Sequence, residues 1–380
     1  MITTVAVAGY RSLRDLVLPL GGLTVVTGPN GSGKSNVYRA LRLLAAAATG
    51  SVVGAIAREG GLPSVMWAGP EVPTGEAKVQ GTVRRGPRAV LLGFAGDELG
   101  YLVDLGLPQV VGPTPFDRDP ELKREQVFAG QVAKPSTLLI DRLRGVTRTR
   151  DGAWRTLAQP LMPYETILTD LAESDTGPEL LALRRTLAGW RFYDHFRTDQ
   201  AAAARAPQVG TRTPILGHDG SDLAAVWATI QDAGFGERLD REVDRAFPGT
   251  RVEIEGVDGR LRLMMHQPGL LRPLDAAELS DGTLRYLLLC AALLPAQPGP
   301  LIVLNEPEAS LHPDLLGPLA ELIAEASAHS QVVVVTHSTP VAGGLERAGA
   351  LTHRLVPTSA GTEIAGQGFL DRPAWNWGSR

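Results

Sequence analysis

A glycine-rich loop near the N-terminus constrains the fold of this chain more than any other feature. Residues 28–35 read Gly-Pro-Asn-Gly-Ser-Gly-Lys-Ser and match the pattern G-x-x-x-x-G-K-[ST] without a mismatch. The apolar run Leu23–Thr27 precedes the loop and reads as a strand, and Asn36–Ala48 follows it with helical periodicity. Strand, loop and helix in this order are the context in which the pattern binds nucleotide phosphates.

The residue types of this loop suit phosphate chemistry. Glycines allow backbone N–H groups to turn inward, and the N-terminus of the following helix adds its dipole. Lys34 is expected to reach the β- and γ-phosphates, and the Ser35 hydroxyl to coordinate Mg²⁺. The sequence therefore predicts a nucleotide-binding protein. The residues expected to contact the nucleotide here are Gly28, Pro29, Asn30, Gly31, Ser32, Gly33, Lys34, Ser35 and Asn36.

Composition excludes several other classes. No apolar run approaches the ~18–20 residues needed to span a bilayer, and the N-terminus lacks the features of a signal peptide. Cys290 is the only cysteine, which excludes a disulfide framework and cysteine-based metal clusters. The net charge of −4 argues against a globally basic nucleic-acid binder. We expect a cytoplasmic protein without a membrane partner.

Three further motifs lie far downstream of the loop. Leu301–Glu308 is an apolar run that ends in carboxylates, as a Walker B strand does. Before it, Glu278–Thr283 reads Glu-Leu-Ser-Asp-Gly-Thr and leads into a helix, so it predicts an anion-binding helix N-terminus. After it, the apolar run Val332–Val335 is followed by Thr336-His337-Ser338. A histidine at that position can contact a γ-phosphate or the attacking water.

These four motifs, in this order, resemble the ABC-type ATPase superfamily. The resemblance is closest to its soluble RecF/SMC/Rad50/OLD-like branch, and within it to the AAA_21 group of ATPases. LSDGT resembles the signature motif, NEPEASLHP the Walker B and D-loop, and VVVVTHS the H-loop. The motifs occupy residues 1–48 and 270–345, and the resemblance covers the middle of the chain only as an expected insertion.

The resemblance implies that two chains dimerise around two ATP molecules. Each ATP would lie between the loop 28–35 of one chain and Leu279, Ser280, Asp281 and Gly282 of the other. Glu306 would polarise the attacking water, and His337 would contact the γ-phosphate. Together with Lys34 these are the expected catalytic residues, and Arg11 is expected to approach the nucleotide.

One residue departs from the family pattern. The Walker B strand of the family carries Asp before the catalytic Glu, whereas this chain has Asn305. Its amide can orient Mg²⁺-bound water but supplies no charge, so the metal ligands expected are Ser35 and Asn305 and hydrolysis is expected to be slow. A switch that binds ATP without hydrolysing it is the alternative. The Q-loop glutamine is left open between Gln126 and Gln131.

The resemblance also bounds function and partners. The leading interpretation is an ATP-hydrolysing switch in DNA repair, chromosome maintenance or phage defence, with DNA as a candidate partner. The alternative is a regulatory ATPase of a separate effector such as a nuclease. A transporter's nucleotide-binding subunit is disfavoured, because its signature motif would lie much closer to the loop.

The expected fold class is α/β, an ABC-ATPase head with a central, mostly parallel P-loop sheet, an antiparallel β subdomain and a helical insertion. The expected domains are 1–150, which holds the loop and the antiparallel strands, 151–215, a helical insertion and linker, and 216–380, which holds the other motifs. Strands are predicted over Lys78–Arg84, Ala89–Phe94 and Gly100–Leu105, and a helix over Tyr164–Phe196.

An arginine cluster falls outside all the motifs. We interpret it as a solvated strand or loop face, and contact with a phosphate backbone is the alternative. The cluster comprises Arg142, Arg144, Arg148 and Arg150.

Overall fold

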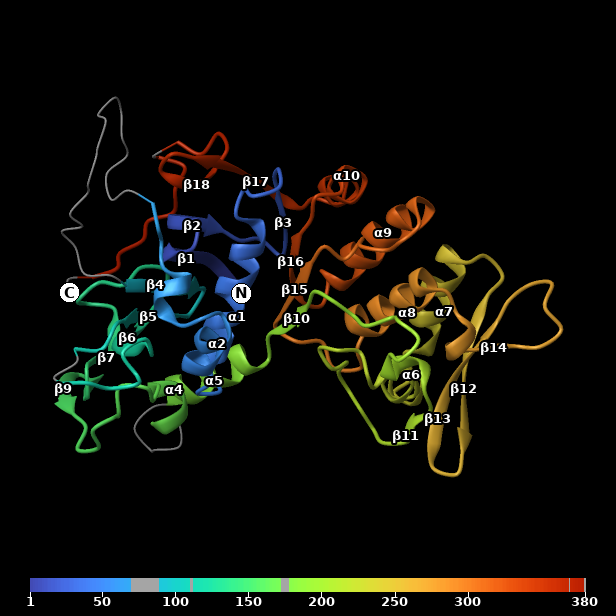
Figure 1. Ribbon diagram of the computed structural model, residues 1–380, viewed down its shortest axis with the longest axis horizontal. Helices are drawn as coiled ribbons and strands as arrows, with labels where there is room; N and C mark the ends of the chain where they lie inside the picture. Colours follow the sequence, from blue (N-terminus) through green and yellow to red (C-terminus); the bar gives the residue numbers. More distant parts are fainter. Residues whose placement is uncertain (70–88, 110–111, 172–177, 369, 379–380) are drawn as a thin grey trace. The chain divides into compact units, whose positions relative to one another are not determined.

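The computed structural model describes residues 1–69, 89–109, 112–171, 178–368 and 370–378. The predicted strand Lys78–Arg84 lies outside these residues. Helices and strands are both abundant, so the fold class is α/β as expected (Figure 1). Contacts divide the chain into two compact units, and each is described by itself. Unit 1 comprises residues 1–21, 27–190 and 353–380, and unit 2 comprises residues 22–26 and 191–352.

Unit 1 contains a large antiparallel sheet with the strand order β2-β1-β4-β5-β6-β7-β8-β9. Consecutive residues are buried in the first two strands, residues 4–7 in β1 and 16–18 in β2, so both faces of the sheet are covered there. The strands are β1 (Ile2–Tyr10), β2 (Leu13–Pro19), β4 (Ala89–Gly96), β5 (Leu99–Gly106), β6 (Glu121–Ala129), β7 (Leu138–Leu143), β8 (Val146–Asp151) and β9 (Ala153–Thr156).

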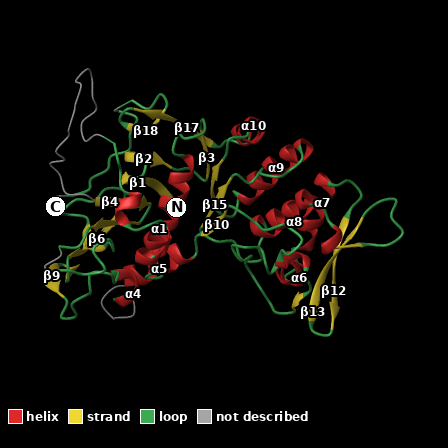
Figure 2. Cartoon of the chain, in the orientation of Figure 1, coloured by secondary structure: helices red, strands yellow, loops and turns green. Residues whose placement is uncertain are grey.

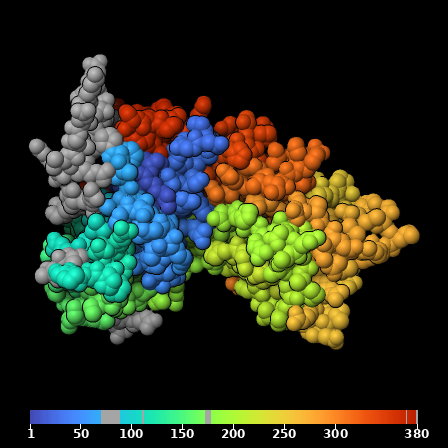
Figure 3. Space-filling model, in the orientation of Figure 1, coloured from blue at the N-terminus to red at the C-terminus, as the bar shows by residue number. Residues whose placement is uncertain are grey.

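Helices and a C-terminal hairpin complete unit 1. The blue N-terminal residues, the teal antiparallel strands and the green residues near 150–190 form one continuous body (Figure 3). The indole of Trp375 packs edge-on against Phe128. The helices are α1 (Lys34–Ala47), α2 (Val52–Arg58), α3 (Leu62–Val65), α4 (Ile167–Asp170) and α5 (Pro178–Ala188), and the hairpin strands are β17 (Leu351–Thr358) and β18 (Gly361–Ile364).

Unit 2 is built on the parallel strands β10 (Arg191–Tyr193), β15 (Leu301–Asn305), β16 (Gln331–Val335) and β3 (Leu23–Thr27). β16 is buried along its whole length, and β15 everywhere but at Asn305, which explains their unbroken apolar sequences. A smaller antiparallel sheet contains β11 (Gln208–Val209), β12 (Arg251–Val257), β13 (Arg260–His266) and β14 (Leu274–Asp275).

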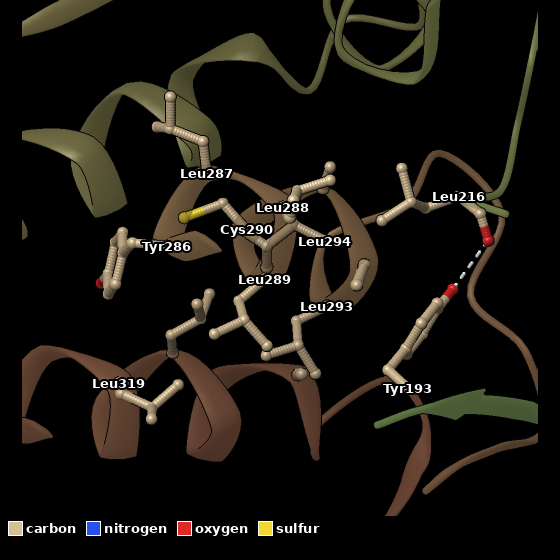
Figure 4. Close-up of a cluster of buried hydrophobic side chains, with 14 of the residues drawn as sticks. Tyr193, Leu216, Tyr286, Leu287, Leu288, Leu289, Cys290, Leu293, Leu294 and Leu319 are labelled. Atoms are coloured by element: carbon tan, nitrogen blue, oxygen red, sulfur yellow. Dashed lines mark hydrogen bonds between the residues drawn. The ribbon is translucent and has the colours of Figure 1, made fainter. Parts of the chain in front are cut away.

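The core of unit 2 is centred on α8, an apolar helix packed among α6, α7 and α9 (Figure 2). Leu287, Leu288 and Cys290 are buried in this cluster, and the Tyr193 hydroxyl donates to the Leu216 carbonyl at 3.0 Å beside it (Figure 4). The helices are α6 (Leu223–Asp232), α7 (Gly236–Ala246), α8 (Asp281–Leu293), α9 (Leu316–Ala326) and α10 (Thr339–Arg347), with 3₁₀ turns η1 (Ala203–Arg205), η2 (Ala276–Glu278) and η3 (Pro313–Leu315).

Two predictions from the sequence are wrong in part. The predicted helix over 164–196 contains α4 and α5 but ends before Arg191, because the aromatic run that follows pairs as β10 with β15. Arg142 is not on a solvated face. Its guanidinium is fully buried, ion-paired with Glu125 and bonded to the Met162 carbonyl at 2.8 Å.

The units of the structure divide the chain differently from the expected segments. Residues 151–190 belong to unit 1 because β9 extends its sheet and α5 packs on α1. The last residues, from 353 on, also belong to unit 1, whereas residues 191–215 belong to unit 2. Among the described residues, no helix is both long enough and apolar enough to cross a membrane.

A buried acidic side chain on α7, Glu242, allows the packing of the helices in unit 2 to be tested. The Glu242 side chain on α7 has no exposed area, accepts from Arg245 and lies near the carboxyl of Glu325. Burial raises the pKa of Glu242 above its ordinary value. The folded state therefore holds this proton more tightly than the unfolded chain. The resulting stability is full below the ordinary carboxyl pKa and is lost as the pH rises toward the raised value.

We therefore expect the Glu242→Gln variant to be more stable than the wild type at pH 8, by on the order of 1 kcal/mol. Its stability should also depend less on pH between 5 and 8. Urea unfolding at several pH values measures both effects, and Glu237→Gln, an exposed acid on the same helix, is the control. Equal pH dependence in the wild type and the Glu242→Gln variant would contradict the assignment.

Candidate functional site: a P-loop, a signature helix and a Walker B edge

The loop after β3 has the backbone that its glycines allow. Gly28, Gly31 and Gly33 adopt positive φ values of 147°, 78° and 95°. A Cβ at Gly28 would lie 2.4 Å from the Leu355 carbonyl oxygen, and one at Gly33 would lie 2.3 Å from Thr362 Oγ1. Only glycine fits these two positions, because both the conformation and the space exclude a side chain.

The lysine of the loop is held in place by the loop itself. Lys34 Nζ donates to the carbonyls of Gly28 at 2.7 Å and Pro29 at 3.0 Å, and the side chain is 5% exposed. Beside it, the buried hydroxyl oxygen of Ser32 has no hydrogen-bond partner among the described residues. A cation fixed over the loop and an unsatisfied hydroxyl fit an anionic phosphate ligand.

A chain of polar contacts supports the loop from behind. Asn36 Nδ2 donates to Ser12 Oγ at 2.9 Å, and Ser12 Oγ lies 2.8 Å from Thr362 Oγ1. These contacts join α1, the turn between β1 and β2, and the C-terminal hairpin. Asn36, which the sequence placed among nucleotide contacts, thus has a structural partner in its own unit.

Arg11, expected near the nucleotide, is paired with an acid. Its Nη2 donates to Glu59 Oε2 at 2.6 Å, and Tyr10 Oη donates to the same oxygen at 2.9 Å. Burial raises the pKa of Tyr10 well above its usual value, so this hydroxyl is a donor at physiological pH. A role of Arg11 toward ATP stays a prediction, and it would require exchange of this ion pair.

In unit 2, the signature residues form the N-terminus of α8. Ser280 is the N-cap, and its Oγ accepts from the Thr283 N–H at 3.1 Å. Ser280 and Asp281 are exposed, whereas Leu279 is buried. A Cβ at Gly282 would lie 3.0 Å from the Ser310 carbonyl, so the helix start and the D-loop approach closely. The exposed start of α8 is suited to bind an anion.

The Walker B edge lies where β15 and β16 end side by side. Parallel pairing places Asn305 opposite Val335, and the Glu306 N–H donates to the Val335 carbonyl at 2.7 Å. Glu306 has a positive φ of 50°, which turns the chain as the strand ends. This register brings His337 Nδ1 to 3.5 Å from Glu306 Oε1. The Walker B glutamate and the H-loop histidine are therefore neighbours.

The side chain of Asn305 has an acceptor oxygen that is suited to bind a metal ion or a water molecule. Its Oδ1 is buried and has no hydrogen-bond partner among the described residues. An unsatisfied amide oxygen fits a bound cation or its water, since Mg²⁺ takes oxygen ligands and keeps several waters. The amide oxygen of Asn305 therefore fits a ligand of Mg²⁺, although it supplies no negative charge.

Glu308 is a site residue that the sequence analysis did not single out. Its side chain is 6% exposed, and Oε1 accepts from the Thr336 hydroxyl and from the N–H groups of His337 and Ser338. One carboxylate thus holds the backbone of His337 and Ser338 and the side chain of Thr336. The second acid of NEPE was the only signal for this role in the sequence.

Arg285, on α8, lies beneath this edge. It is 3% exposed, and its Nη2 donates to the carbonyls of Asp194 and Glu306 at 3.3 Å each. Burial lowers the pKa of Arg285, and the negative charge of Glu308 opposes that effect. The arginine thus connects the signature helix to the Walker B turn inside unit 2.

The contacts of Gln126 and Gln131 distinguish the two candidates for the Q-loop glutamine. Gln126 lies in β6, is 2% exposed, and donates from Nε2 to Asp141 Oδ1 at 2.7 Å. Gln131 is exposed in the loop after β6. The side chain of Gln126 is thus bound within the sheet of unit 1. Gln131 is the more accessible candidate for the Q-loop glutamine.

Comparison with known families shows the family of this chain. The family model AAA_21, described as "AAA domain, putative AbiEii toxin, Type IV TA system", matches residues 23–342. The chain belongs to this family. The matched residues include the loop 28–35, Ser280, Glu306 and His337.

Two kinds of relative accompany the AAA_21 match. A segment of 44 residues, 12% of this chain, is 46% identical to the OLD nuclease of Thermus scotoductus and spans 8% of that protein. A crystal structure of an Smc head bound to the C-terminal winged-helix domain of ScpA shares the fold. Its TM-score is 0.50 at 15% identity, with 97% of this chain and 98% of that one covered. The SMC head of Thermotoga maritima matches with a TM-score of 0.47 at 17% identity, covering 96% and 98%.

The contacts of Glu308 give a prediction for stability. Replacing Glu308 with Ala removes the acceptor of the buried Thr336 hydroxyl and of the partly buried N–H groups of His337 and Ser338. It should therefore destabilise the protein by about 1–3 kcal/mol. Glu308→Gln keeps one acceptor oxygen, so its free energy of unfolding should fall by less than that of Glu308→Ala. Denaturant unfolding measures both, with Glu346→Gln on the exposed face of α10 as control. Equal stability of Glu308→Ala and the wild type would show that the carboxylate does not hold the H-loop.

Proposed function

We propose that this protein is an ATP-binding and ATP-hydrolysing switch that dimerises around two ATP molecules. The observation that carries the proposal is the pair formed by Glu306 and His337 at the ends of adjacent parallel strands. A carboxylate and an imidazole so placed suit the activation of water and the stabilisation of a γ-phosphate. The P-loop and the exposed start of α8 support it as two separate anion-binding surfaces.

Each residue has a defined role in this proposal. Lys34 binds the β- and γ-phosphates, and Ser280 with the N–H groups of α8 receives the γ-phosphate of the ATP bound by the partner chain. Glu306 accepts a proton from the water that attacks the γ-phosphorus, and ADP leaves. Mg²⁺, held by Ser35 and Asn305, would neutralise phosphate charge when bound.

The cellular setting follows from relatives and stays a proposal. The similarity to an OLD nuclease segment and to an Smc head supports a role in DNA repair, chromosome maintenance or phage defence. DNA or a separate effector protein would then be the partner. The cytoplasmic location expected from the sequence also stays a prediction.

Substitution of the proposed general base tests the dimer. Glu306→Gln should reduce ATP hydrolysis ~10²-fold or more, because the base is lost. Since ATP then persists, the variant should elute as a dimer with ATP and Mg²⁺ in size-exclusion chromatography with light scattering. The double variant with Lys34→Ala should stay monomeric. A monomeric Glu306→Gln variant with ATP bound would contradict the proposal.

Asn305 favours a second candidate, a switch that binds ATP but does not turn it over. Restoring the charge in Asn305→Asp should lower the Mg²⁺ concentration needed for half-maximal activity and raise turnover several-fold, since hard cations prefer carboxylates. Steady-state phosphate release during Mg²⁺ titration measures both. Release at background level in the wild type, with normal release in Asn305→Asp, would favour the binding-only switch.

A further inference from the structure

A buried arginine that lies outside every motif in the sequence contacts the signature residues in the structure. Arg205, at the end of η1, is 8% exposed. Its Nη1 donates to the carbonyl of Leu279 at 2.7 Å, and its Nη2 to Asp281 Oδ1 at 2.7 Å. These two partners are the residues on either side of Ser280.

The same guanidinium also binds the turn that leads into the motif. Nη1 donates to the carbonyls of Ala276 at 3.0 Å and Ala277 at 3.3 Å, and Nε donates to the Thr198 carbonyl at 2.8 Å. The carbonyls of Ala276 and Ala277 belong to η2, whose start is closed by a capping box between Asp275 and Glu278. The guanidinium therefore binds both the carbonyls of η2 and the first residue of α8.

This arrangement needs the planar fork of arginine. The guanidinium donates from all three of its nitrogens: Nε and Nη2 each have one acceptor, and the two N–H bonds of Nη1 serve three carbonyls. Lysine presents three donors on one nitrogen and cannot reach the same partners. Among the described residues, the exposed side chain of Ser280 bonds to Thr283 and its carbonyl accepts from the Leu284 N–H, both on its own helix, so its position depends on how the start of α8 is held.

We propose that Arg205 is the positioning residue of the signature motif. It holds Leu279 and Asp281 so that Ser280 and the N–H groups of α8 face the γ-phosphate of the partner's ATP. This inference rests on the proposed function. It also makes a separate claim, because Arg205 acts on the signature surface of unit 2 and not on the P-loop. Its loss weakens the ATP-dependent dimer and leaves ATP binding by the P-loop intact.

The test places Arg205→Lys and Arg205→Met in the Glu306→Gln background. Binding of a fluorescent ATP analogue at low protein concentration reports the P-loop, and sedimentation velocity with ATP and Mg²⁺ reports the dimer. We expect nucleotide affinity within about two-fold of the parent and a dimer weakened ~10-fold or more. Arg212→Lys is the control, since Arg212 is exposed and forms an exposed ion pair with Asp232.

A second variant keeps the test decisive if the buried substitutions unfold the protein. Asp281→Asn alters an exposed side chain, removes the charge that faces Arg205, and should weaken the dimer by a smaller factor. If the Glu306→Gln parent dimerises, and the Arg205 and Asp281 variants fold and dimerise as tightly as this parent, then the proposed role of Arg205 is wrong. The proposed function is not affected by that result. A Glu306→Gln parent that binds the ATP analogue but does not dimerise overturns the proposed function, and the inference falls with it.

Discussion

The parallel pairing of β15 with β16 is the constraint that holds the candidate site at the carboxyl ends of these strands. It aligns Asn305 with Val335, and the bond from the Glu306 N–H to the Val335 carbonyl continues the alignment one residue past the strand. The Walker B carboxylate and His337 are thereby held together by backbone geometry. Glu308, three residues after Asn305, then binds Thr336, His337 and Ser338, so side-chain contacts also join the two strand ends.

The sequence predicted the elements whose pattern is local. The loop 28–35 requires positive φ at its glycines, and Leu23–Thr27 is buried along a parallel strand, so motif and periodicity both indicate one structure. The N-cap role of Ser280 followed from the same local chemistry. In each case the residues that decide the structure lie within a few positions of one another.

The contacts that the sequence did not reveal join distant segments. Arg142 belonged to an apparent basic cluster, yet it is buried because Glu125, on the neighbouring strand β6, neutralises it. Arg205 lay in a segment expected to be a linker, and its partners are some 70 residues downstream. A charge is buried only where partners surround it, and periodicity carries no information about partners so far away.

If two chains share each ATP site, two variants that are inactive by themselves should complement each other when they are mixed. Glu306→Gln keeps an intact signature surface, and Ser280→Arg, at an exposed position, keeps an intact P-loop and Glu306. In a mixed dimer, the P-loop of the second variant faces the signature surface of the first. Each variant alone should be inactive, and the mixture should hydrolyse ATP. A mixture no more active than the sum of its parts would contradict a shared ATP site.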